Sequence, residues 1–348
     1  MDFELTPDQV SLQEAIRAFC DGRFPPDAVR AIEDAGGRLD RSRWRELGDT
    51  GVFALRVPEA EGGLGLGASE AVLVFEELGR ALVPGPVVAT ELAARFVTDA
   101  VTGERIVGVV DTRDSLVVVE YPDDVDSLLV VGDDDVRLAD TGALHGVDAT
   151  RPLDALTPVR WVSEPLPDGE TLGGTELVDE LRRVGRVLTG ALQLGIAART
   201  VELATAYAKE REQFGRQIGS FQAVKHLIAD MLVRAEVTRA AVYAAACAID
   251  GRSDDDPDRA AKVAKVVAGE AALENARTCI QVHGGIGYTW ELDVQRYWKR
   301  ASVLDTHFGN RDECAQSIAL MVRNGAGGSL AEGVETESGV THLVGEKA

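Results

Sequence analysis

The sequence predicts a mainly α-helical protein with a small β domain in its middle. Two long stretches, 6–100 and 175–322, carry apolar residues at three- and four-residue spacing, the period of a helix that buries one face. The stretch between them holds short β-branched runs separated by Asp, Pro and Gly at intervals of about ten residues, which indicates strands. The predicted parts are an N-terminal helical domain, 1–102, a small β domain, 103–172, a C-terminal helical bundle, 173–322, and a tail, 323–348.

The N-terminal domain begins with a strong helix signal. Thr6 suits the N-cap position and Pro7 the first helical position, and Leu12, Ile16 and Phe19 then share one face. A glycine-dense loop interrupts the helical pattern in the middle of the domain, at 57–67. Further helices are expected at 26–36, 40–50, 69–82 and 86–99.

The β domain contains short apolar runs bounded by turn residues. Strands are expected at 106–110, 115–119 and 127–131, with further strands at 136–138 and 160–162. The domain ends near residue 170, in a segment that contains two prolines.

The C-terminal part predicts long helices joined by short loops, which form an antiparallel bundle. Pro257 follows three aspartates and can begin the third of these helices. The helices are expected at 175–210, 219–250, 258–283, 291–299 and 302–322. The tail that follows is rich in Gly, Glu and Ser and has no apolar stripe, so we expect it to be disordered.

The composition excludes several classes of protein. The net charge of −22 disfavours nucleic acid and anionic lipid as partners. No apolar run reaches the roughly 18 residues of a membrane span. The four cysteines form no CxxC pair, which predicts buried free thiols and a cytoplasmic location, and the five histidines lack the spacing of a metal site.

Two glycine-containing runs, 211–222 and 281–288, each follow a long predicted helix. Glycine has no Cβ, so its backbone can come close to a bulky group such as a cofactor phosphate. Tight helix packing is the alternative explanation for either run alone. The two runs together, in this order, favour a cofactor.

With a third run, Val57-Pro58-Glu59 followed by glycines to residue 65, these motifs resemble the acyl-CoA dehydrogenases. These flavoproteins desaturate acyl-CoA thioesters between Cα and Cβ. The resemblance covers residues 1 to about 322. It implies the acyl-CoA dehydrogenase fold with a C-terminal four-helix bundle, FAD as the cofactor, acyl-CoA as the substrate and electron-transfer flavoprotein as the usual electron acceptor.

The resemblance also implies a set of residues that contact the ADP half of FAD, for a flavin held mainly by the neighbouring subunit. A guanidinium suits a pyrophosphate, an aromatic ring can cover adenine, and glycine backbone can approach phosphate oxygens. For the aromatic residue taken alone, a place in the core is an equally good explanation. The implied contacts are Arg211, Phe214, Gln222, Gln281, Val282, His283, Gly284 and Gly285.

No catalytic residue can be carried over. The position that holds the catalytic glutamate in most of the family is Phe308 here, and the position used by other members falls near Gly185. Asp305 is the leading candidate for a substitute base and Glu291 the next, although each is more ordinarily a solvated or capping carboxylate. Without one of them, this chain cannot remove the α-proton.

The motif that holds the flavin ring in the family is missing as well. The family carries a Thr-Glu-Pro-x-x-Gly-Ser-Asp-like run, where this chain reads differently over 110–115. A later Trp-Ile-Thr/Ser run is echoed only weakly at 161–163, and the β domain is short for the family.

The residues that serve a neighbour's FAD are kept, whereas those for the chain's own flavin ring and base are lost. The sequence therefore resembles the short, base-lacking subunit of bacterial heteromeric (α2β2) acyl-CoA dehydrogenases, some of which degrade steroid side chains. The expected partner is a second acyl-CoA dehydrogenase-like chain. Two alternatives stay open: a homomeric enzyme with a substitute carboxylate, and a non-catalytic scaffold or thioester-binding protein.

Overall fold

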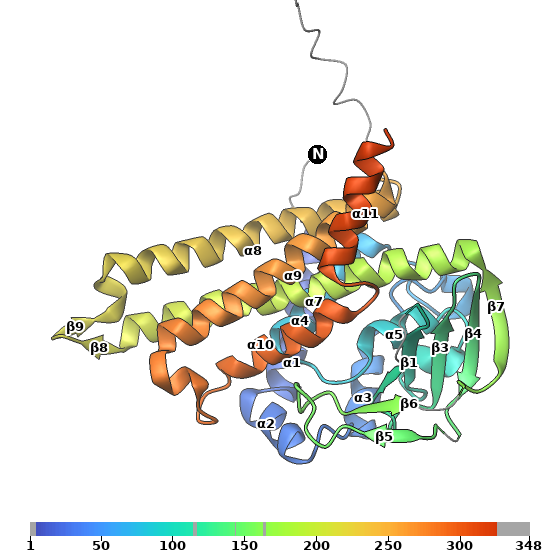
Figure 1. The fold of residues 1–348 in the computed structure, drawn as a ribbon, viewed down its shortest axis with the longest axis horizontal. Coiled ribbons are helices and arrows are strands. Elements are labelled where there is room, and N and C mark those ends of the chain that lie inside the picture. The colour runs from blue at the N-terminus through green and yellow to red at the C-terminus, as the bar shows by residue number, and fades with distance from the viewer. Residues whose placement is uncertain (1–4, 114–116, 143, 163–164, 326–348) are drawn as a thin grey trace, which may run out of the picture.

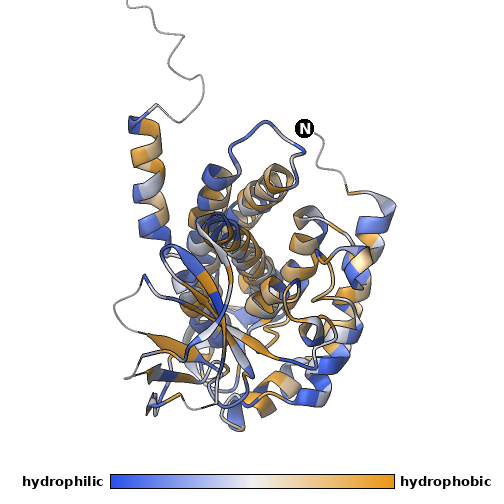
Figure 2. Ribbon diagram, turned by 90° about the vertical axis from the view of Figure 1, so that its right-hand side faces the viewer, coloured by the Kyte–Doolittle hydropathy of each residue, from blue (hydrophilic) through white to orange (hydrophobic). Residues whose placement is uncertain are grey.

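The computed structural model describes residues 5–113, 117–142, 144–162 and 165–325. Three long helices of the bundle run side by side, the N-terminal helices pack against one flank of them, and the β domain lies under one end (Figure 1). In a view turned by 90°, the hydrophobic residues, coloured orange on the ribbon, lie mainly where the helices face one another (Figure 2). The predicted tail from residue 326 lies outside the described residues.

The N-terminal domain is helical, as predicted. Thr6 caps the first helix, because its hydroxyl accepts a hydrogen bond from Gln9 N at 3.2 Å. The expected single helix at 86–99 is wrong: the segment forms two helices, and Val97 adopts extended backbone at the start of the second. The helices are α1 (Pro7–Arg23), α2 (Pro26–Asp34), α3 (Arg41–Asp49), α4 (Ala68–Arg80), α5 (Val87–Ala93) and α6 (Thr98–Val101). The glycine-dense loop holds only a short 3-10 helix, Glu59–Glu61.

The β domain forms two small sheets, with strand orders β1-β3-β4-β7 and β2-β6-β5. The edge strand β1 pairs in parallel with β3, and all five residues of β3 are buried. The sequence did not predict β5 and β7, which carry little apolar character and form through pairing at sheet edges. Part of the strand expected at 115–119 lies outside the described residues. The strands are β1 (Val107–Asp111), β2 (Val118–Glu120), β3 (Ser127–Val131), β4 (Asp135–Asp140), β5 (Gly146–Asp148), β6 (Val159–Val162) and β7 (Gly169–Gly174).

The bundle follows the prediction closely in its three long helices and less closely at its end. The last break comes at 307–310 rather than near 301, because the Asn310 side chain caps the final helix by accepting from Glu313 N at 2.9 Å. The helices are α7 (Thr175–Glu210), α8 (Gln222–Ile249), α9 (Pro257–His283), α10 (Val294–Thr306) and α11 (Arg311–Arg323), and a small hairpin, β8 (Glu212–Gln213) and β9 (Arg216–Gln217), follows α7. Helix α7 is apolar and long enough to cross a membrane, yet 78% of its apolar window is buried inside the protein, as in a core helix.

A buried lysine in the bundle makes stability depend on pH. Burial lowers the pKa of Lys265 to about 8, and its Nζ donates a hydrogen bond to the Leu304 carbonyl. An unfolded lysine titrates near pH ~10.4, so the unfolded chain holds more protons between these values and its free energy of unfolding rises with pH. The Lys265→Met variant should lose this rise. Relative to that variant, the wild type should gain on the order of 3 kcal/mol between pH 8 and 10.5, as measured by urea denaturation. Parallel stability curves for the two proteins would contradict the assignment.

Candidate functional site

The two glycine-containing runs meet at one end of the bundle. Helix α7 ends at Glu210 and α9 at His283, and the β8–β9 hairpin projects from this end, at the left of Figure 1. Tyr207, one turn before Arg211, stacks on the His283 ring with 4.2 Å between ring centroids. The packing of α7 against α9 therefore brings together the two motifs that are separated by about seventy residues of sequence.

The cofactor residues expected in the first run lie open to solvent. Phe214 is 92% exposed, so it is no core residue, and its positive φ of 54° holds it at the tip of the hairpin. Arg211 and Gln222 are exposed as well. The guanidinium of Arg211 forms no ion pair within the part of the chain that the structure describes, which leaves it free for an external anion.

The second run divides into exposed and buried parts. Gln281 and both glycines are exposed, whereas the side chains of Val282 and His283 are buried and face the bundle. Burial lowers the pKa of His283, and its Nδ1 lies 2.8 Å from the Cys279 carbonyl oxygen, to which the neutral ring donates. These two side chains support the helix end and leave only their backbone to face a ligand.

Helix packing does not explain the glycine pair in this run. A Cβ added at Gly284 or Gly285 would meet no atom within 4 Å. Gly287 differs, because a Cβ there would lie 2.7 Å from the Ile280 carbonyl oxygen. The open backbone at 284–285 is free to face something outside this chain.

The two positions at which the sequence resemblance places the family's catalytic base lie against each other. Phe308 lies in the loop after α10 and is buried, and a Cβ at Gly185 on α7 would lie 2.5 Å from its ring. Arg186 Nε donates a hydrogen bond to the Phe308 carbonyl at 3.0 Å, which holds the loop in place. The phenylalanine ring thus occupies the space that a carboxylate at 185 would need, and neither position offers a proton acceptor.

The two substitute carboxylates lie elsewhere. Asp305 points from α10 into the bundle, where a Cβ at Gly269 would lie 2.6 Å from its Oδ1. Glu291 is exposed on the loop before α10, and its carbonyl oxygen accepts from Arg30. Neither residue lines the cavity described next.

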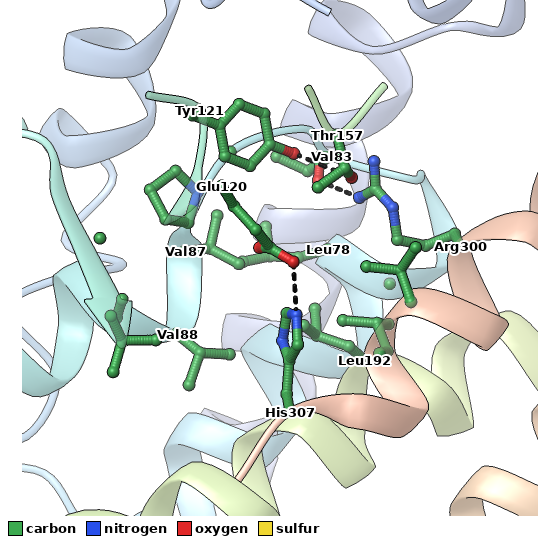
Figure 3. A pocket seen from close by; sticks show the side chains of 18 of the residues that line it. Leu78, Val83, Val87, Val88, Glu120, Tyr121, Thr157, Leu192, Arg300 and His307 are labelled. Atoms are coloured by element: carbon green, nitrogen blue, oxygen red, sulfur yellow. Dashed lines mark hydrogen bonds and ion pairs between the residues drawn. The ribbon is translucent and has the colours of Figure 1, made fainter. Parts of the chain in front are cut away.

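A cavity lies between α4, α5, the first sheet strands and α10, and holds about 640 Å³ of space not filled by atoms, its open mouth included. Its walls are mainly apolar, and a carboxylate and an imidazole point toward each other within it (Figure 3). Glu120 at the end of β2 places Oε1 2.8 Å from His307 Nε2. Sequence reasoning missed this pair, because the two residues are 187 positions apart and no motif marks either of them.

One wall of the cavity is a buried polar network. Arg300 donates from Nε to Asp154 Oδ2 at 2.5 Å and from Nη1 to the Val83 carbonyl at 3.1 Å. Tyr121 OH lies 3.3 Å from the Thr157 hydroxyl, and burial raises the pKa of Tyr121 to about 12, so this tyrosine stays protonated. The network joins α10 to the loop before β6 and fixes the shape of the cavity.

The comparisons with known proteins agree with this architecture. Residues 6–104 match the N-terminal domain of acyl-CoA dehydrogenases and residues 173–319 match their C-terminal domain, with the β domain between them. The chain is 32% identical over 303 residues to the acyl-CoA dehydrogenase IpdE2 of Mycolicibacterium smegmatis, with 85% of this chain and 93% of that protein covered. It is 34% identical over 367 residues to the acyl-CoA dehydrogenase FadE34 of Mycobacterium tuberculosis, covering 94% of this chain but only 50% of FadE34.

Solved structures show the same fold. The ChsE4-ChsE5 complex from Mycobacterium tuberculosis matches with a TM-score of 0.80 at 25% identity, covering 93% of this chain and 99% of the matched one. Butyryl-CoA dehydrogenase from Megasphaera elsdenii matches with a TM-score of 0.77 at 20% identity, covering 93% and 100%, which bears on the fold alone. The predicted fold class, FAD as the cofactor and an oxidoreductase acting on acyl-CoA as the class of enzyme are thereby confirmed. The chain belongs to the acyl-CoA dehydrogenase family.

Proposed function

We propose that this chain is one subunit of a heteromeric FAD-dependent acyl-CoA dehydrogenase. It contributes the residues that hold the ADP half of FAD, while a second acyl-CoA dehydrogenase-like chain supplies the catalytic base. When bound, FAD supplies the oxidant for α,β-desaturation of an acyl-CoA thioester. One contrast carries the proposal: the Arg211 and Phe214 side chains are open to an external ligand, whereas Phe308 fills the place of the base.

The exposed bundle end has the chemistry that an ADP group needs. The Arg211 guanidinium, which has no ion pair among the residues that the structure describes, can bind a pyrophosphate through two hydrogen bonds. The bare ring of Phe214 can cover adenine, and the open backbone at 284–285 can approach phosphate oxygens. This part of the structure fits the FAD of a neighbouring subunit.

The lining of the cavity and of the cleft outside it also supports the need for a partner chain. The outer cleft that continues the cavity is lined by the carboxylates of Asp111, Glu120, Asp154 and Glu313, and Lys and Arg are absent from its described lining. Asp111 is paired with Arg182, and Asp154 with Arg300. A lining that offers no unpaired cation does not attract a pyrophosphate. A homomeric enzyme remains the second candidate, and Glu120 is the observation that favours it, because it is the carboxylate that this cavity offers.

The relatives point to an assembly of two unlike halves. FadE34 matches this chain over only half of its length, so a segment of this kind is joined there to further chain of comparable size. The ChsE4-ChsE5 structure is a complex, and another similar structure is the Tcur3481-Tcur3483 steroid ACAD variant, with a TM-score of 0.79 at 26% identity. On these grounds we extend the proposal to an α2β2 heteromer and a steroid side-chain CoA ester as substrate. The sequence resemblance and the unpaired cysteines are the grounds for proposing electron-transfer flavoprotein as electron acceptor and a cytoplasmic location.

The test is expression of the chain alone and together with the acyl-CoA dehydrogenase encoded beside it. The lone chain should carry little flavin and show no turnover, whereas the co-expressed complex should be yellow and active. Arg211→Ala should weaken FAD binding by the complex about ten- to a hundredfold, because hydrogen bonds to a charged group contribute about 1.5–3 kcal/mol. The complex itself should still assemble. Flavin absorbance after gel filtration measures both.

Arg277→Ala is the matched control, because Arg277 is exposed on α9 and pairs only with Glu274 among the described residues. Unchanged flavin content in Arg211→Ala would refute the role of Arg211. Stoichiometric FAD and turnover by the lone chain would establish the homomeric enzyme instead. A stable, colourless chain that joins no dehydrogenase partner would indicate the scaffold.

A further inference from the structure

Tyr207 and His283 connect the ends of the two helices that precede the proposed FAD motifs. Their rings are stacked, with 4.2 Å between the centroids and 25° between the planes. Tyr207 lies one turn before Arg211, and His283 is the last residue of α9, directly before the glycine pair. The stack is therefore a direct contact between the two segments, at the end of the bundle from which the β8–β9 hairpin projects (Figure 1).

Each partner of the stack is also hydrogen-bonded within its own segment. The Tyr207 carbonyl accepts from Arg211 N at 2.8 Å, and Ile218 N donates to the Arg211 carbonyl at 2.8 Å, which closes the base of the hairpin. His283 Nδ1 donates to the Cys279 carbonyl at 2.8 Å, which sets the plane of the imidazole ring. A shift of the α7 end relative to the α9 end would therefore have to break the stack.

The surroundings make Tyr207 the main lateral contact of this stretch of α7. The stack adjoins a small cluster of buried residues that is separate from the main core. The α7 side chains that this cluster buries are small, Ala204 and Ala208, so Tyr207 supplies the large ring. Its hydroxyl has no hydrogen bond within the described part of the chain, so the ring itself makes the contact. Loss of the ring should then loosen this end of the bundle and leave the main core folded.

We propose that Tyr207 is a positioning residue for FAD, which acts through its stack on His283. The stack fixes the Arg211 backbone relative to the open backbone at 284–285, so that one ADP group can reach both. Contacts that are already in place bind a ligand more tightly than contacts that must be ordered on binding. Tyr207 lies outside the motif residues that the sequence assigns to the cofactor, so its role rests on the proposed function and deepens it.

The test measures the affinity of the co-expressed complex for FAD. Tyr207→Ala should weaken FAD binding about fivefold, equivalent to about 1 kcal/mol, while the complex still assembles. Tyr207→Phe keeps the ring and should bind FAD as the wild type does. In the Tyr207→Ala/His283→Ala double variant the loss should be smaller than the sum of the two single losses, because each substitution by itself removes the stack. Titration of FAD into the complex after removal of its flavin, followed by flavin fluorescence, gives the affinity, and gel filtration reports assembly.

Phe19→Ala is the matched control, because Phe19 is a half-buried aromatic residue whose ring contacts Phe24 and neither motif. It should leave the affinity for FAD unchanged. If circular dichroism shows Tyr207→Ala to be unfolded, Tyr207→Leu replaces it, since leucine keeps apolar volume without a ring, and the same loss is expected.

Arg211→Ala in the same series separates the positioning role from the proposed function. Weakened FAD binding in Arg211→Ala together with wild-type affinity in Tyr207→Ala would overturn the role of Tyr207 and leave the proposed function standing. Unchanged affinity in Arg211→Ala would refute the proposed function itself. An equal loss in Tyr207→Phe and Tyr207→Ala, or losses that add fully in the double variant, would also overturn the positioning role.

Discussion

Gly195→Ala is expected to lower the free energy of unfolding by about 3 kcal/mol or more, or to prevent folding. Helices α4 and α7 cross at Gly79 and Gly195, where a Cβ at Gly195 would lie 1.9 Å from the Glu76 carbonyl oxygen and 2.6 Å from Arg80 N. Both are backbone atoms of a buried helix, so no side-chain rotation relieves the clash. The helices would have to move apart and open the core that they share. Urea denaturation followed by circular dichroism measures the loss.

Gly22→Ala provides the matched control, because Gly22 is also a helical glycine and a Cβ there meets no atom within 4 Å. Alanine is the better helix former by about 1 kcal/mol, so this variant should be slightly more stable than the wild type. Equal stability of Gly195→Ala and the wild type would show that α4 and α7 pack less closely than the structure shows.

Arg300→Leu is expected to cost about 3–5 kcal/mol, because it leaves a buried carboxylate without its cation. Asp154 is 2% exposed, and Arg300 donates to it from Nε at 2.5 Å. Burial alone lowers the pKa of Arg300, but the Asp154 carboxylate outweighs it, and the pKa ends above its ordinary value. The pair is thus strongly coupled, and chemical denaturation of the variant at pH 7 measures the loss.

Adding Asp154→Asn to the Arg300→Leu variant should recover part of that loss. Asparagine carries no charge that would be buried without a partner, and it can still accept the hydrogen bond from Leu156 N that Asp154 accepts at 3.1 Å. Arg277→Leu removes an arginine from an exposed ion pair and should change stability by less than about 1 kcal/mol. An Arg300→Leu loss no larger than that of Arg277→Leu would mean that solvent reaches Asp154.

Much of the architecture could be predicted from sequence, because the signals are local. The apolar period predicted α7 with its observed bounds, Thr175–Glu210. The continuous apolar run predicted β3, Ser127–Val131. The strand β7, Gly169–Gly174, was not predicted, because its residues have little β propensity and the strand forms by pairing with β4. The division of 86–99 was not predicted, because no Gly or Pro marks the end of α5 at Ala93.

The site divides in the same way. The motifs that we propose bind the nucleotide could be recognised in the sequence, because glycine, arginine and phenylalanine at set spacings are themselves the signal. The exposure of Phe214 is compatible with that proposal. The pair of Glu120 and His307 could not be predicted from the sequence, because neither residue belongs to a motif. Only the fold brings His307 Nε2 to 2.8 Å from Glu120 Oε1.

By itself the sequence determined the order of helical and β domains, because this order follows from the spacing of apolar residues. It also determined the family and the lack of a proton acceptor at Phe308 and Gly185, because these follow from residue identity. Only the tertiary structure decided that Phe308 fills the space above Gly185 and that a carboxylate and an imidazole share a cavity. Contacts between residues far apart in the chain arise from how helices and sheets pack, and no local pattern records them.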